Sequence, residues 1–233
     1  DFGGPLTVSG TAADDGQGYD VNLRGQGPGG IDARVTGRVR TDGSGGNLAI
    51  NGTAQAGLAN AFLSGRLISG PVRFDLGLNG AFTPASLSGR VALTGGRIAD
   101  PGLAFALQDV ALAADLAGGR AQISGGGALT SGGRVEVGGG VGLAAPFQAD
   151  IRVGLRGAVL RDPQLFQTTA NGEVTIRGPL TGGGAIGGQI TLSETEVQIP
   201  STGLGGAADI PELRHVNEPG PVRETRARAG LLD

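Results

Sequence analysis

The 233-residue sequence contains no Cys, Met or Trp, it has a single His, and aromatic residues make up 3% of it. Without Cys the chain has no disulfide scaffold, no thiol nucleophile and no thiolate-ligated zinc. One His removes a His-rich metal site or a His pair. Long apolar runs are also missing, because stretches such as residues 109–115 are bounded by charge or Gly well short of the roughly 20 residues that a membrane helix needs.

The positively charged residues are all of one type. Lys is absent, so all 18 cationic residues are Arg, and the formal net charge is -3. A weakly acidic chain has no general electrostatic attraction to nucleic acid, and we expect no nucleic-acid partner. The mean hydropathy of +0.04 is too apolar for a chain that stays disordered through charge and polarity.

Alternation of apolar and polar residues is the dominant pattern that is present. Every second residue is apolar in residues 147–156, and residues 72–79 repeat the pattern. Shorter copies occur at residues 31–40, 47–54, 90–98, 133–137, 173–177 and 189–199. Strict alternation predicts strands with one apolar and one polar face. The continuous apolar runs of parallel strands that are covered on both sides are missing, so the predicted fold class is all-β.

Glycine is the most over-represented residue, with 48 positions or about a fifth of the chain. We expect the polar face of the strands to be rich in Gly, Ala, Ser and Thr. Gly inside strands marks bends and bulges, so this content predicts an elongated, continuously curved sheet. Evidence for helix is limited to a turn or two at residues 57–63.

An imperfect repeat supports an elongated sheet. Residues 97–103 recur in outline as residues 159–165, and the Asp-Pro pair in both copies predicts a turn. Such loose copies are typical of a sheet built by adding similar hairpins. Near residue 203 the sequence becomes mixed in charge and rich in Pro. We therefore predict a continuous repetitive β-segment at 1–205 and a polar tail or linker at 206–233, within a chain that we expect to be a piece of something longer.

Candidate chemical motifs have simpler explanations. The three spaced glycines of residues 25–30 match a dinucleotide-binding pattern, but residues 31–35 alternate as a strand where that mechanism needs a helix. The hairpin-turn interpretation is therefore preferred.

Titratable residues do not form a catalytic set in the sequence. His215 lies near Glu212 and Glu218, but there is no Cys and no Ser in a Gly-x-Ser-x-Gly pattern. Glu194 and Glu196 are two residues apart, and we expect them on the same polar face as solvated side chains. We predict no enzyme, no catalytic residue, no metal site and no cofactor.

The apolar face is the remaining candidate for function, and two interpretations stay open. It is either the core between two packed sheets or the lining of an open trough that offers its surface to an apolar guest. Exposing a lipid acyl chain to water costs about 0.8 kcal/mol per methylene, or roughly 12 kcal/mol for about 15 methylenes. A continuous aliphatic stripe removes most of that barrier and leaves the guest mobile.

The chain resembles the TamB family, the inner-membrane-anchored periplasmic component of the translocation and assembly module. The resemblance rests on residues 171–180, with a strand and a Gly-Pro-Leu turn, and on residues 188–200, with Gly-x-Ile-x-Leu and an aliphatic-Pro ending. Residues 87–101 and the tail at 213–229 are similar to further parts of the family.

The resemblance implies a taco-like β-groove with a hydrophobic interior, akin to bridge-like lipid transfer proteins. It implies phospholipid transport between the two membranes of a Gram-negative bacterium and assembly or secretion of outer-membrane proteins with TamA, an outer-membrane β-barrel. It carries no catalytic residues. The partners are then phospholipid acyl chains, a TamA-like barrel through the full-length protein, and nascent outer-membrane β-strands bound by strand addition. The residues predicted to line the groove are Val72, Phe74, Leu76, Leu78, Ile151, Val153, Leu155, Val174, Ile176, Ile190 and Leu192.

A second hypothesis comes from a different class. A structural or adhesive β-solenoid of a secreted surface protein would also be rich in Gly and strands. It predicts stacked rungs of equal length and a polar exterior ladder, whereas the repeats found here are unequal.

Overall fold

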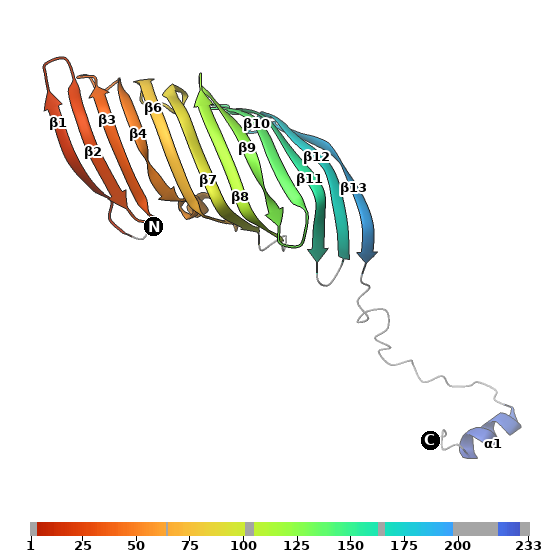
Figure 1. Cartoon of the computed structure of the whole chain (residues 1–233). Helices are drawn as coiled ribbons and strands as arrows, with labels where there is room; N and C mark the ends of the chain where they lie inside the picture. The colour runs from red at the N-terminus through yellow and green to blue at the C-terminus, as the bar shows by residue number, and fades with distance from the viewer. Residues whose placement is uncertain (1–3, 64, 101–104, 163–165, 198–218, 229–233) are drawn as a thin grey trace. The chain divides into compact units, whose positions relative to one another are not determined.

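The computed structural model describes residues 4–63, 65–100, 105–162, 166–197 and 219–228. The chain forms two units, Asp1–Val197 and Gln198–Asp233. The first is a β-sheet, and the second contains the helix α1, Gly220–Arg228 (Figure 1). The boundary predicted between residues 205 and 206 lies outside the described residues, as does His215 with its two neighbouring glutamates.

Thirteen strands form one antiparallel sheet, and twelve of them follow sequence order from β1 to β13 across it (Figure 1). The exception, β5, pairs with the end of β7 beyond the segment that β6 covers. The strands are β1 Thr7–Asp14, β2 Tyr19–Gly27, β3 Ile31–Val39, β4 Gly45–Gln55, β5 Leu67–Ser69, β6 Pro71–Ala81, β7 Leu87–Asp100, β8 Phe105–Ala117, β9 Arg120–Leu129, β10 Arg134–Gly142, β11 Gln148–Asp162, β12 Phe166–Pro179 and β13 Ala185–Val197. The predicted all-β, curved and open sheet is confirmed.

The described part of the chain contains no second sheet to cover the first. The interpretation of the apolar face as a core between two sheets is therefore wrong. Short 3-10 helices interrupt the strands at η1, Ala56–Phe62, close to the predicted helical turn, and at η2, Pro84–Ser86.

Two buried clusters lie on the apolar face toward one end of the longer strands. The first consists of Ala56, Leu93 and Val110, and the second of Leu129, Ala158 and Ala170. Leu107 packs against both.

The excursion from η1 to β5 is held onto the sheet by polar contacts. The Asn60 amide donates to the Ile68 carbonyl at 3.1 Å and accepts from the Ile68 N–H at 2.8 Å. Arg66 donates from Nε to the buried Asp100 carboxylate at 2.9 Å. These bonds place η1 over the first buried cluster.

β-Bulges recur at equivalent places in β7 and β11. The register shifts between Leu93 and Gly96 in β7 and between Leu155 and Ala158 in β11. Gly95 and Gly157, with φ of 61° and 55°, occupy the two bulges. Asp100 ends β7 and Asp162 ends β11, so both copies of the loose repeat end a bulged strand.

A further bulge, in β13, corrects one expectation drawn from the sequence. β13 places Glu194 and Thr195 opposite the single residue Thr168, and Glu194 has a φ of 50°. An extra residue shifts the side-chain alternation by one position. Glu194 and Glu196 therefore do not share a face through regular alternation, as their spacing had predicted.

Glycines lie on both faces of the sheet. We expected them mainly on the polar face, but a set of them lies on the apolar face. Seven of these have φ between 110° and 150°: Gly10, Gly37, Gly89, Gly125, Gly139, Gly172 and Gly188. A Cβ added to Gly139 would lie 2.1 Å from the Asp150 carbonyl oxygen of the neighbouring strand. Only glycine fits this backbone, and the set lets the strands coil tightly.

We predict that Gly139→Ala destabilises the sheet by about 2 kcal/mol or more, because its Cβ collides with backbone and its φ is unsuited to an L-residue. Gly154 on adjacent β11 is the matched control, since a Cβ there meets nothing within 4 Å. Gly154→Ala should be neutral or stabilise by up to about 1 kcal/mol. Urea unfolding of both variants measures the difference, and equal stabilities would contradict this account of the glycines.

Candidate functional site

A row of directly paired residues crosses the whole sheet on its apolar face. It contains one residue from each of the twelve strands in sequence order, and each is Gly, Ala, aliphatic or Phe. The row is Val8, Gly25, Ala33, Gly52, Phe74, Val91, Ala114, Ile123, Gly139, Ile151, Ile176 and Ile186. No polar side chain interrupts it.

A second row runs beside the first and is equally apolar. It consists of Gly10, Leu23, Val35, Ile50, Leu76, Gly89, Leu116, Ala121, Val141, Ala149 and Gly178. Together the two rows define a hydrophobic stripe that runs perpendicular to the strands, along the length of the sheet.

All eleven residues predicted to line the groove lie on this face. Val72, Phe74, Leu76 and Leu78 come from β6, and the others from β11, β12 and β13. Cross-strand pairing brings Val153 beside Val174. The β6 residues lie five strands away from the β11 residues, so the eleven do not form one compact pocket.

Burial differs between the two faces of the single layer. Leu48 and Leu78 are 8% and 7% exposed, and most other apolar-face residues of the inner strands are half-buried. Charged residues on the opposite face are mostly exposed. A flat uncovered sheet would expose both faces equally, so the sheet curves around its apolar side and forms a groove with a hydrophobic interior.

Two of the predicted groove residues also pack against the buried clusters. Val72 packs against the first cluster and Leu155 against the second, so these two predicted groove residues also serve as core. Polar groups are also present on the inner face beyond the clusters. Asp100 ends β7 there, and the buried Thr168 hydroxyl lies 2.8 Å from the Thr195 hydroxyl.

The outer face has a matching row in which all residues but Gly140 and Ala185 are polar or charged. In order across the sheet it is Ser9, Arg24, Arg34, Asn51, Asp75, Arg90, Asp115, Gln122, Gly140, Asp150, Arg177 and Ala185. Arg90 pairs with Asp115 at 3.3 Å, and Arg177 with Asp150 at 3.4 Å. These polar side chains make the outer face of the groove hydrophilic.

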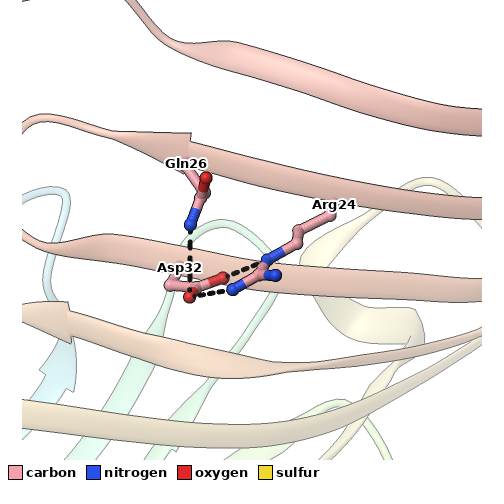
Figure 2. A network of polar contacts seen from close by, with 3 residues as sticks. All are labelled: Arg24, Gln26 and Asp32. Carbon is pink, nitrogen blue, oxygen red and sulfur yellow. Dashed lines mark hydrogen bonds and ion pairs between the residues drawn. The ribbon is translucent and has the colours of Figure 1, made fainter.

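One outer-face network is shown in Figure 2. Arg24 donates two hydrogen bonds to the Asp32 carboxylate, at 2.9 and 2.6 Å, and the Gln26 amide adds a third at 3.4 Å. The Arg24 hydrogen bonds hold the pKa of Asp32 below its usual value, and the same contact raises the pKa of Arg24. Arg34, a residue of like charge, is the direct cross-strand partner of Arg24.

Two shallow hollows on the outer face were not found by sequence reasoning. They measure about 540 and 470 Å³, and Arg152 lines both. They exist because Gly138, Gly140 and Gly154 lack side chains between charged neighbours. The spacing of these glycines in the sequence does not indicate the hollows, because the glycines come together only through the pairing of neighbouring strands.

The described residues contain no group of three or more His, Cys, Asp or Glu side chains placed to hold a metal ion. None of the described helices is long and apolar enough to span a membrane.

Comparison with family models finds the TamB C-terminal domain at residues 122–230. Residues 122–230 belong to the TamB family. The family indicates an envelope protein of a Gram-negative bacterium. Searches of curated proteins and of solved structures found no match.

The TamB match begins within β9 and covers slightly less than half of the chain. It includes the predicted groove residues of β11, β12 and β13 but not the four of β6. The apolar rows nevertheless pass from the matched strands into β6 and on to β1 without a change of face. The part outside the match therefore extends the same apolar face.

We predict that Asp32→Asn lowers the melting temperature slightly at about pH 7 and that this difference is lost at acid pH, as the Asp32 carboxylate becomes protonated in the folded state. The folded-state pKa of Asp32 lies below the unfolded value, so its stabilisation is present above the unfolded pKa and is lost as the pH falls through the folded pKa. Added salt should also shrink the difference, because the pair is exposed. Glu173→Gln, on the same face, controls for the loss of one negative charge, and a pH-independent difference would contradict this role of Arg24.

Proposed function

We propose that this chain is a segment of a periplasmic TamB-like protein that is anchored in the inner membrane, bridges the two membranes and shields phospholipid acyl chains in its groove. The observation that carries the proposal is the apolar row of one residue per strand, from Val8 to Ile186, which no polar side chain interrupts. Such a row provides a continuous path along the sheet rather than a single binding pocket.

The chemistry of the row suits a guest that moves. An acyl chain of about 15 methylenes gains roughly 12 kcal/mol when it leaves water for an apolar surface. Aliphatic side chains and glycines supply this surface without a directional contact at any one place. Hydrogen-bond donors or charges inside the groove would instead hold a headgroup in position.

In this proposal the lipid headgroups stay in water at the open side of the groove. The full-length protein works with a TamA-like barrel in assembling or secreting outer-membrane proteins, and this segment has no catalytic role. A nascent outer-membrane β-strand is a second candidate guest. Within the described residues β13 pairs only with β12, and this favours a strand guest, because an extended strand can add to the edge of a sheet.

The β-solenoid alternative is contradicted by the strand arrangement. A solenoid stacks equivalent strands in parallel rungs, whereas here each strand pairs antiparallel with its sequence neighbours. The strands also differ in length, from 3 residues in β5 to 15 in β11.

We predict that Val153→Glu abolishes lipid binding by the chain while the fold survives. Val153 lies half-buried on the inner face between Val137 and Val174, and an open groove lets water reach the new carboxylate. The chain is purified from bacteria, and the co-purified lipid is measured by native mass spectrometry with lipid extraction. We expect about one phospholipid or more per wild-type chain. The variant should retain at least about tenfold less lipid, because a carboxylate that faces an acyl chain loses part of its hydration.

The matched control is Gly154→Glu, which introduces the same charge one residue later on the outer face, where there is room for a side chain. It should bind lipid as the wild type does. Leu76→Arg in β6 repeats the inner-face test outside the family match. Lipid-free wild-type protein, or equal lipid in the Val153→Glu and Gly154→Glu variants, would overturn the proposal.

A further inference from the structure

The outer face of β9–β12 is positively charged, although the chain as a whole has a formal net charge of -3. On the part of this face that precedes the β11 bulge, arginines outnumber acidic residues. The arginines are Arg120, Arg134, Arg152, Arg156 and Arg177, and the acids are Glu136, Asp150 and Glu173. Arg156 pairs with Glu136 at 3.0 Å. Arg177 pairs with Asp150 at 3.4 Å.

Two other arginines line the smaller of the two outer-face hollows. These are Arg120 and Arg152, and within the described part of the chain neither has an ion-pair partner. The hollow measures about 470 Å³, within the range of about 300–1,000 Å³ that is typical of small-molecule sites. A Cβ added to Gly140 would lie 3.0 Å from Arg120 Nη2 and 3.3 Å from Gln122 Oε1, so both side chains extend over this glycine. Arg152 lies on the next strand, directly opposite Gly138.

The backbone does not require glycine at either of these floor positions. Neither Gly138 nor Gly140 has a positive φ, and a Cβ on Gly138 would meet nothing closer than the Ile123 carbonyl oxygen at 3.9 Å. Gly139 between them differs, because a Cβ there collides with backbone. Glycine inside a strand costs stability through its conformational entropy and its missing side chain. What the two floor glycines leave in return is open space between two guanidinium groups.

We propose that this hollow binds a phosphodiester group. A guanidinium donates through a planar fork that matches the oxygens of phosphate and carboxylate. One guanidinium can satisfy both oxygens of a carboxylate. A tetrahedral phosphate offers further oxygens, so it can accept from Arg120 on β9 and Arg152 on β11 together.

Asp150 sets the charge of the ligand. Its carboxylate lines the same hollow directly opposite Gly140, and Arg177 pairs with it from β12, the side away from Arg120. This carboxylate repels a ligand with two negative charges more strongly than a ligand with one. A phosphodiester has a single negative charge, which suits a site of two guanidiniums beside one partly neutralised carboxylate.

The larger hollow, of about 540 Å³, is not part of the proposed site. Glu136 and Glu173 line it together with Arg152 and Arg156, so its positive and negative charges balance. The excess of positive charge therefore lies on the Arg120 side of Arg152.

The site is separate from the groove, because one layer of sheet lies between them. Gly138 and Gly140 face outward, whereas Gly139 belongs to the inner apolar row. The proposal is therefore independent of lipid transport in the groove. Two sources carry the chemistry that it names: the headgroup of a phospholipid in a membrane, and a free glycerophosphodiester.

NMR titration of the isotope-labelled chain with glycerophosphoglycerol at low salt tests the site. The Gly138 and Gly140 amide signals should shift and saturate, and Arg152→Gln should weaken binding at least about fivefold. Arg152→Lys should restore only part of the affinity, because an ammonium group lacks the planar fork. Arg73→Gln removes an exposed outer-face guanidinium from β6, outside the hollow, and should bind as the wild type does.

Gly138→Val separates binding from stability. Valine favours strands and has room at this position, so the variant should be at least as stable as the wild type in urea. It should bind glycerophosphoglycerol at least about fivefold less tightly, because its side chain fills the floor. The lipid that co-purifies with the chain should not change, because the inner face is untouched.

Sedimentation with phosphatidylglycerol vesicles identifies the source of the ligand. Vesicle binding that Arg152→Gln abolishes, without binding of the soluble diester, supports the proposal and assigns a lipid headgroup. Binding of the soluble diester supports it and assigns a free ligand. Three results would overturn the proposal: no binding of either probe, sulfate binding as tight as that of the diester, or equal binding by the wild type, Arg152→Gln and Gly138→Val.

Discussion

Antiparallel pairing in an unbroken register is the constraint on which the groove depends. Side chains alternate between the two faces of a strand, so a slip of one residue in any pair would turn the apolar residues of all later strands to the outside. The row through Phe74 shows that no such slip occurs across twelve strands. The charged row through Asp75 runs beside it on the opposite face. One set of backbone hydrogen bonds therefore creates both the hydrophobic interior and the polar exterior.

The departures from this register are as informative as its continuity. In β7, β8, β11 and β13 an extra residue shifts the alternation, and the buried clusters lie around the bulges of the first three strands. The bulges bend the strand ends so that Val110 and Ala158 lose nearly all contact with water, at 1% and 0% exposure. A single layer thus obtains a core at one end of its strands and keeps a half-covered apolar surface along the rest.

Alternation was sufficient to predict the face of all eleven groove residues, because hydrophobicity distinguishes inside from outside at each of those positions. It was insufficient where the residue itself carries no such signal. Glycine has no side chain, so nothing in the sequence assigned Gly139 to the inner face or Gly140 to the outer. The bulge at Glu194 is encoded by pairing with Thr168, a residue 26 positions away, and local spacing misjudged it. The choice between one sheet and two also depends on long-range pairing.

An uncovered apolar face needs a physical explanation, since monomeric soluble proteins rarely keep a large one. A second sheet is excluded for the described residues, and curvature alone leaves the central side chains half-exposed. Three partners remain for such a surface: a face-to-face copy, a protein strand and a lipid. A face-to-face copy would be held by a compact apolar patch, and a protein strand would be held by one edge of the sheet. The apolar row instead extends across every strand and is lined by residues that bind nothing directionally, which fits best an apolar chain that passes from strand to strand. The TamB match at residues 122–230 is consistent with that use of the groove.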